Sequence, residues 1–171
     1  GSAPEKKQVI LNNGTTLNYD YLVVGLGAID ASYGVEGIEP NAFSFKSAEQ
    51  CAAIYHQLNE LRVASKPSRV TIIGAGITGV EALGEIFRNE QFSHLKITIL
   101  EAQSRLLPKN SPELDRYIRD LCKPYPVDFR CHEAAQRIRK KSVLLRSGES
   151  LASDLTIWTG GPAPSPLLSA A

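Results

Sequence analysis

Three glycines at a fixed spacing constrain the fold of this chain more than any other feature. Gly74-x-Gly76-x-x-Gly79 follows the β-branched run Val70–Ile73 and opens a predicted helix that extends to about Asn89. The first glycine permits a tight turn, the second lets backbone approach a pyrophosphate, and the third lets the helix pack on the strand. The helix N-terminus adds free N–H groups and a positive dipole end. The pattern predicts a dinucleotide-binding βαβ unit on a buried parallel strand.

The next strand carries an acid at its end. Ile97–Leu100 is a second buried run and is followed by Glu101, a little beyond the usual interval of about 20 residues from the first glycine. A carboxylate there accepts hydrogen bonds from the adenine ribose hydroxyls and repels a 2′-phosphate, so Glu101 predicts NAD(H). Arg105 is close enough in sequence to receive such a phosphate, which leaves NADP(H) open.

Two residues of the predicted glycine helix are further candidates. Thr78 lies in the first turn, where its hydroxyl can donate to a phosphate. Glu81 follows Gly79 by two residues and can face the nicotinamide end of a dinucleotide. An acid near a helix N-terminus is also stabilised by the helix dipole, which requires no function. Both interpretations of Glu81 stay open from spacing alone.

A second feature is an internal repeat. Val9–Gly27 and Val143–Gly161 share one order of elements: a strand, a tight glycine turn, a returning strand, then Asp and a buried strand that ends in glycine. At one constant offset, Gly14 matches Gly148, Leu17 matches Leu151, and Asp20 matches Asp154. The repeat predicts two homologous nucleotide-binding units, of which the first lacks its opening; a chance match of two hairpins is the alternative.

Composition limits the class of protein. The 171 residues suit one domain with a full core, and 43% hydrophobic with 22% charged residues is ordinary for a soluble α/β protein. A net charge of +1 gives no indication of nucleic-acid binding, and no apolar stretch approaches the roughly 18 residues that span a bilayer. Three cysteines and three histidines show no metal-ligand spacing, so no metal site is predicted. The Gly1-Ser2 opening and the lack of methionine indicate an excised fragment with a tag remnant.

The remaining pattern predicts an α/β fold. Ala28–Phe45 is rich in Gly, Pro, Asn and Ser and is expected to be a loop. Ser47 and Gln50 form a capping box, and Pro112 starts a helix capped by Ser111. The first of these helices has the apolar stripe Cys51, Ile54, Tyr55, Leu58 and Leu61, and further strands are expected at 127–131, 135–139 and 155–159. We expect a Rossmann-like parallel sheet with helices on both faces and a small antiparallel β-hairpin or meander.

These residues resemble a known family. Val70–Glu85 together with Ile97–Pro108 is similar to the NAD(H) domain of the two-dinucleotide-fold flavoproteins, the pyridine nucleotide-disulfide oxidoreductase superfamily. Ser153–Gly161 resembles the closing strand of that domain, and Tyr19–Ala28 resembles the strand that returns from its FAD domain. The branch it resembles most is the FAD-containing type II NADH dehydrogenases. The resemblance implies that residues 1–45 are a tag remnant, a partial FAD-domain stub and a linker, and that residues 46–171 are an NAD(H)-binding domain.

The resemblance also implies a mechanism. NADH would bind on the Gly74–Gly79 loop with its nicotinamide on the flavin of the other domain, and hydride would pass to FAD and on to a quinone or another acceptor. Glu81 would lie near nicotinamide and flavin, and Gly160-Gly161 would approach the nicotinamide. The stretch Gly25-Leu26-Gly27 departs from the family's Ala-Thr-Gly, and the N-terminal FAD fingerprint is absent. The fragment alone is therefore expected to bind NADH and to turn over nothing.

The candidate set and its alternatives follow. The cofactor-binding residues we expect are Gly74, Ala75, Gly76, Ile77, Thr78, Gly79, Glu81, Glu101, Ala102, Arg105, Thr159, Gly160 and Gly161, with no catalytic residue. Expected partners are NADH, the missing FAD domain and a quinone or other acceptor. The fragment is expected to be soluble and its parent to be peripheral to a membrane. We also expect the fragment to self-associate through the stub. The alternatives are a nucleotide-fold module that does not use NADH catalytically, as in sulfide:quinone reductases, and a self-contained Rossmann dehydrogenase. The second lacks support, because Tyr55, Tyr117 and Tyr125 have no Lys four residues on.

Overall fold

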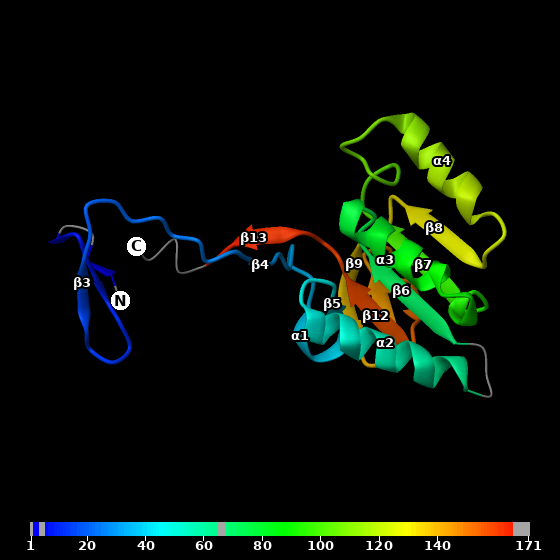
Figure 1. The fold of residues 1–171 in the computed structure, drawn as a ribbon. Helices are drawn as coiled ribbons and strands as arrows, with labels where there is room; N and C mark the ends of the chain where they lie inside the picture. Colours follow the sequence, from blue (N-terminus) through cyan, green and yellow to red (C-terminus); the bar gives the residue numbers. More distant parts are fainter. Residues whose placement is uncertain (1, 4–5, 65–67, 166–171) are drawn as a thin grey trace. The chain divides into compact units, whose positions relative to one another are not determined.

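The computed structural model describes residues 2–3, 6–64 and 68–165, which fall into two compact units (Figure 1). The larger unit is Asp30–Gly161. The smaller combines Gly1–Ile29 with Pro162–Ala171. Each unit has its own sheet structure. In the described residues, no helix is both long enough and apolar enough to cross a membrane.

A five-stranded parallel sheet forms the centre of the larger unit. Its strands, in spatial order, are β5 (Phe43–Ser44), β12 (Leu155–Trp158), β6 (Arg69–Ile73), β7 (Lys96–Glu101) and β8 (Val127–Cys131). Ile73 of β6 lies opposite both Trp158 and Leu100, so β12, β6 and β7 end level with one another. The loops that follow these three strands therefore meet at one edge of the sheet, where open α/β folds bind ligands.

Helices cover one face of this sheet. They are α2 (Ala48–Arg62), α3 (Ile77–Arg88), α4 (Pro112–Cys122) and the 3₁₀ turn Glu90–Phe92. Alternate strand residues such as Ile72, Ile99 and Ile157 point to this side and join Leu83 of α3 and Ile118 of α4 in the main hydrophobic core. Side chains that alternate along buried strands leave a second apolar set for the other face.

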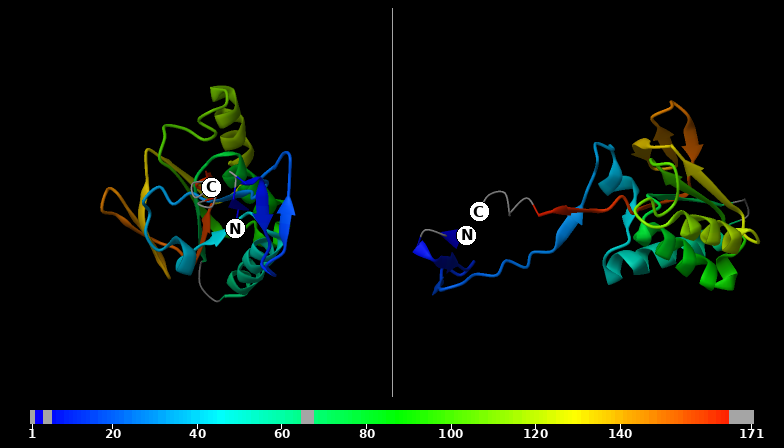
Figure 2. Two further views of the ribbon diagram at one scale, coloured as in Figure 1. Left: turned by 90° about the vertical axis from the view of Figure 1, so that its left-hand side faces the viewer. Right: turned by 90° about the horizontal axis from the view of Figure 1, so that it is seen from above.

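The other face is covered by an antiparallel sheet. Its strands are β9 (Ala135–Arg139), β10 (Ser142–Leu145) and β11 (Ser150–Ala152), in the order β11-β10-β9. Ile138 and Val143 pack against Trp158 in a second core, beside Ile38 of the one-turn helix α1 (Ile38–Asn41). In the right-hand view of Figure 2, β9–β11 and the long helices lie on opposite sides of the central strands. The predicted α/β sheet and meander are confirmed, but among the described helices only α1 lies on this second face.

The segment predicted as a loop, Ala28–Phe45, contains short elements instead. β4 (Ala28–Asp30), α1 and β5 all lie within it. None is longer than four residues, which is too short for a hydrophobic period to appear in the sequence. This part of the prediction is wrong because β5 is set by pairing with β12, a contact that only the tertiary fold supplies.

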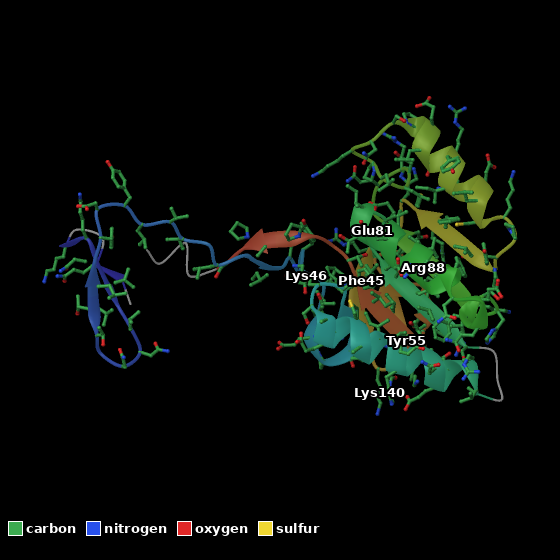
Figure 3. All side chains as sticks on the ribbon, viewed as in Figure 1. Phe45, Lys46, Tyr55, Glu81, Arg88 and Lys140 are labelled. Carbon is green, nitrogen blue, oxygen red and sulfur yellow. The ribbon has the colours of Figure 1, made fainter. Side chains whose placement is uncertain are left out.

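The start of α2 follows the prediction in part. Ser47 is the N-cap, and its Oγ accepts from the Gln50 N–H at 3.3 Å. The Gln50 side chain turns to the Ser44 N–H rather than to Ser47, so only half of the capping box forms. Ile54 and Leu58 of the predicted stripe are buried, whereas Tyr55, labelled in Figure 3, is mostly exposed and meets Phe92 edge-on.

The smaller unit contains the first copy of the repeat. β1 (Ser2–Ala3), β2 (Gln8–Ile10) and β3 (Thr16–Asn18) form an antiparallel sheet, and β13 (Pro162–Pro164) pairs with β4. Gly14 has a φ of +83° in the predicted hairpin turn. The buried strand predicted at 21–27 does not form, and Tyr21 is 94% exposed. Unlike β12, this segment has no strand beside it among the described residues, so its backbone stays unpaired.

Backbone protection should separate the two copies of the repeat. We expect the amides of residues 21–27 to exchange with solvent at least about a hundredfold faster than those of β6, which pairs on both edges. Hydrogen exchange read by mass spectrometry measures this directly. Equal protection of the two segments would contradict this expectation, because it would show that the backbone of residues 21–27 is hydrogen-bonded in solution.

Candidate dinucleotide-binding site

The candidate site lies at the edge where β6, β7 and β12 end. The glycine loop follows β6, Glu101 closes β7, and Thr159–Gly161 follows β12. The register of these strands brings the three segments together. Residues predicted from three separate stretches of sequence thus form one continuous rim.

Two glycines of the loop are required by the fold itself. Gly74 has a φ of +106°, and a Cβ there would lie 2.7 Å from the Thr159 carbonyl oxygen. Its N–H donates to Leu100 O at 2.8 Å, which joins the turn to β7. A Cβ on Gly79 would overlap the Gly74 carbonyl oxygen, because α3 passes directly over the turn. The structure therefore gives both glycines the steric roles that the spacing predicts.

Gly76 is different, because nothing within the chain requires it. It is the N-cap of α3, with φ −70° and ψ −173°, a conformation open to any residue. A Cβ built on Gly76 would meet no atom within 4 Å. The space beside Gly76 lies at the N-terminus of a twelve-residue helix, where backbone N–H groups lack intrahelical partners. The absence of a side chain keeps that space open.

Glu101 holds the loop from the side of β7. Its side chain is buried, with 8% of the residue exposed. Oε2 accepts from the Ala75 N–H and Oε1 from the Gln103 N–H, both at 2.9 Å. The Ala75 carbonyl in turn accepts from the Leu107 N–H at 2.8 Å, so the Ala75 residue is fixed on both sides. Each carboxylate oxygen retains a second lone pair for a ribose hydroxyl.

Arg105 points into its own loop. Its guanidinium donates to the carbonyls of Asn110 at 2.9 Å and Pro108 at 2.8 Å. Receiving a 2′-phosphate would require these two hydrogen bonds to break. The geometry therefore favours the NAD(H) interpretation of Glu101 over the NADP(H) alternative. Ala102, beside them, is exposed on the same rim.

The segment after β12 closes over the turn. Thr159 Oγ1 lies 2.7 Å from Gly74 O and 3.0 Å from Ile73 O, and the Thr159 N–H donates to Ile73 O at 2.9 Å. A Cβ on Gly160 would overlap the Trp158 indole, and Gly161 has a φ of +115°. Both glycines thus have structural reasons of their own, and their approach to a nicotinamide stays a prediction.

The helix residues divide between exposed and half-buried positions. Ile77 is exposed and Thr78 half-buried at the start of α3. Glu81 is exposed on the same helix (Figure 3), with no hydrogen bond or ion pair to any described residue. α3 has no acidic residue in its first turn, and the dipole effect falls off within that turn. The dipole explanation for Glu81 is therefore weak, and its place near a nicotinamide stays a prediction.

Sequence reasoning missed how the loop before α4 supports this site. Asp115 of α4 accepts from the Leu106 N–H at 2.9 Å and pairs with Arg119 at 3.0 Å. The next residue, Leu107, is buried with a φ of +46° and donates to Ala75. No local sequence signal marks this connection, because it joins residues through a loop without periodicity. In the described part of the chain, no cluster of three or more His, Cys, Asp or Glu could hold a metal ion.

Asp115 is expected to make a pH-dependent contribution to the free energy of unfolding. Burial disfavours its charge, but hydrogen bonds from Arg119 and Leu106 outweigh burial and lower the pKa of the carboxyl. The stabilisation is complete above the unfolded pKa of about 3.9 and is lost as pH falls through the lower folded pKa. We expect Asp115→Asn to reduce the free energy of unfolding by about 1–3 kcal/mol at pH 7, with the difference shrinking below pH 4. Urea unfolding of both proteins at pH 7 and below pH 4 measures the difference. A difference that does not change with pH would contradict the lowered pKa of Asp115.

The fold and the rim define a Rossmann-type nucleotide-binding unit. A family model described as pyridine nucleotide-disulphide oxidoreductase matches residues 2–171. The chain belongs to this family. The resemblance inferred from the sequence is confirmed, including its NADH dehydrogenase-like branch.

The chain is also similar to curated relatives and, in its fold, to solved structures. A probable NADH dehydrogenase of Dictyostelium discoideum is 28% identical over 89% of this chain and 39% of its own length. A type II NADH:quinone oxidoreductase of Haemophilus influenzae is 23% identical over 84% of this chain and 39% of its own. The Plasmodium falciparum NDH2 structure in complex with NADH has a TM-score of 0.79 at 21% identity, covering 97% of this chain and 40% of that one. The chain thus spans about two fifths of these relatives.

Proposed function

We propose that the Asp30–Gly161 unit binds NAD(H), with the pyrophosphate on the Gly74–Gly79 loop and the adenine ribose on Glu101. The observation that carries this proposal is the contrast among the three glycines. Gly74 and Gly79 are required by the chain's own packing, whereas Gly76 is not. An unneeded glycine at a helix N-terminus leaves room for backbone to approach a phosphate.

NAD(H) is preferred to NADP(H) in this proposal. The Glu101 carboxylate lies at the end of β7, already oriented by the Ala75 and Gln103 N–H groups. Its negative charge would repel a 2′-phosphate, and Arg105 is occupied by the carbonyls of Pro108 and Asn110. The relatives named as NADH dehydrogenases support the same choice.

The whole protein is proposed to oxidise NADH through FAD. FAD, when bound in the parent, accepts the hydride and passes electrons to a quinone or another acceptor. Within this chain, Gly74–Gly79 and Glu101 bind the dinucleotide, and Glu81 is the acid near its nicotinamide end. The sequence contains one Gly-x-Gly-x-x-Gly fingerprint, Gly74–Gly79, and residues 46–171 are proposed to bind NADH without turnover. A parent peripheral to a membrane would fit relatives named as quinone oxidoreductases.

Residues 21–27 of the smaller unit are proposed to pair with the FAD domain. Large apolar side chains in this segment are exposed, including Tyr21, Val23 and Leu26, and its backbone lacks a strand partner among the described residues. An apolar, unpaired edge of this kind associates with other strands. Where the FAD domain is missing, we expect the segment to drive self-association instead, which sedimentation analysis of the wild type over a range of concentrations measures.

Calorimetric titration of the wild type and Gly76→Val tests the proposed function. We expect NADH to bind the wild type, NADPH at least about tenfold more weakly, and FAD not at all. Gly76→Val should lose NADH binding yet lose only about 1 kcal/mol of stability or less, because its side chain enters open space. Equal NADH affinity of both proteins would exclude the loop as the pyrophosphate site. No binding of any nucleotide would favour a fold that does not use NADH.

A further inference from the structure

We propose that Tyr33 forms one wall of the subsite for the nicotinamide half of the dinucleotide. This inference rests on the proposed function and extends it to a residue outside every motif considered above. It depends on three observations: the place of the loop that carries Tyr33, the exposed side chain of Tyr33, and the direction in which a dinucleotide must extend along the sheet edge.

The loop around Tyr33 is fastened to the glycine pair after β12. The Ala31 N–H donates to Gly161 O at 2.9 Å, and the Trp158 Nε1–H donates to Ala31 O at 3.2 Å. The Tyr33 hydroxyl lies 3.5 Å from the position that a Cβ on Gly161 would take. All of these residues belong to the larger unit. The tyrosine therefore lies directly against the Gly160-Gly161 segment.

Tyr33 is the second residue of a tight turn, which the Val35 N–H closes by donating to Ser32 O at 2.9 Å. Its φ is +49°, in the left-handed region that bulky residues rarely adopt. The residue is 63% exposed, and its hydroxyl has no hydrogen bond to any described residue. An exposed tyrosine whose hydroxyl has no partner among the described residues is suited to contact a ligand.

The order of the strands directs the nicotinamide towards Tyr33. Glu101 lies at the end of β7, the glycine loop at the end of β6, and Gly160-Gly161 at the end of β12. These strands are consecutive in the order β12-β6-β7. A dinucleotide with its adenine ribose on Glu101 and its pyrophosphate at Gly76 therefore extends its second half towards β12. There the Tyr33 ring offers an apolar surface and its hydroxyl a hydrogen bond.

The test compares two ligands that differ only by the nicotinamide base, because ADP-ribose keeps the second ribose of NADH. NADH and ADP-ribose are titrated against the wild type, Tyr33→Gly, Tyr33→Phe and Tyr117→Ala. Tyr33→Gly removes the ring but accepts the left-handed backbone, so the fold is retained. Tyr117 is a matched control, a 60% exposed tyrosine on α4. We expect Tyr33→Gly to weaken NADH about tenfold and to leave ADP-ribose within about twofold, with Tyr33→Phe between and Tyr117→Ala unchanged.

The outcomes separate this inference from the proposed function. NADH binding to the wild type that Tyr33→Gly leaves unchanged would overturn the role of Tyr33 alone. An equal loss for NADH and ADP-ribose would also overturn it, because that result indicates a change in the whole site. Failure of the wild type to bind either ligand would overturn the proposed function together with this inference.

Discussion

Gly79→Ala is expected to destabilise the larger unit by about 3 kcal/mol or more. The added Cβ would overlap the Gly74 carbonyl oxygen and lie 3.0 Å from Thr159 Oγ1. Both neighbours are held in place, the first as backbone of the turn and the second by its hydrogen bonds to Ile73 and Gly74. Overpacking against atoms that cannot move costs more than the usual 1–3 kcal/mol. Urea denaturation followed by circular dichroism measures the loss.

Gly84→Ala is the matched control in the same helix. Gly84 also lies inside α3, but a Cβ there would meet nothing within 4 Å. Because alanine is the better helix former, this variant should gain about 0.5–1 kcal/mol. Two substitutions that are chemically the same should thus have effects of opposite sign. If both variants shifted the unfolding midpoint by the same amount, the result would contradict the claim that α3 passes directly over the turn at Gly74.

Glu101→Ala should impair both stability and NADH binding. It leaves the buried Ala75 N–H and the half-buried Gln103 N–H without their acceptor. A buried donor without a partner costs about 1–3 kcal/mol, so we expect a loss of about 2–4 kcal/mol. NADH affinity should fall at least about tenfold, because the ribose acceptor is lost and the Ala75 residue is released. Chemical denaturation and calorimetry measure the two effects.

Two further variants separate charge from position. Glu85→Ala removes an exposed carboxylate paired with Arg88 and should change stability by no more than about 0.5 kcal/mol. Glu101→Gln keeps one carbonyl oxygen but removes the charge that repels a 2′-phosphate. Its preference for NADH over NADPH should therefore shrink relative to wild type. An unchanged preference would show that Glu101 supports the loop without selecting the nucleotide.

The elements predicted well are those whose sequence is locally consistent with the fold. The strand before Gly74 is a run of β-branched residues. The atom that lies nearest to a Cβ built on Gly79 belongs to Gly74, as the spacing of the glycines implies. The strands at 127–131 and 135–139 have the predicted bounds. Local pattern and tertiary packing agree at these positions, so either one suffices for prediction.

The elements predicted badly depend on distant partners. Residues 21–27 match β12 in sequence, but β12 is a strand because β5 and β6 flank it. The two-residue strand β5 likewise arises from a tertiary contact. At the site, the link from Asp115 through Leu106 and Leu107 to Ala75 joins loop to helix without a periodic signal. Pattern within one segment carries no information on such pairings.

Chemical-shift mapping of the amide signals with NADH tests the central claim most directly. If the Asp30–Gly161 unit binds NADH as proposed, the largest changes should fall on Gly76, Ile77 and Thr78, whose N–H groups lie at the start of α3. Smaller changes should appear at Gln103 and at Gly160-Gly161. Changes confined to β9–β11 or to residues 6–29, with the glycine loop unaffected, would contradict the assignment of this site.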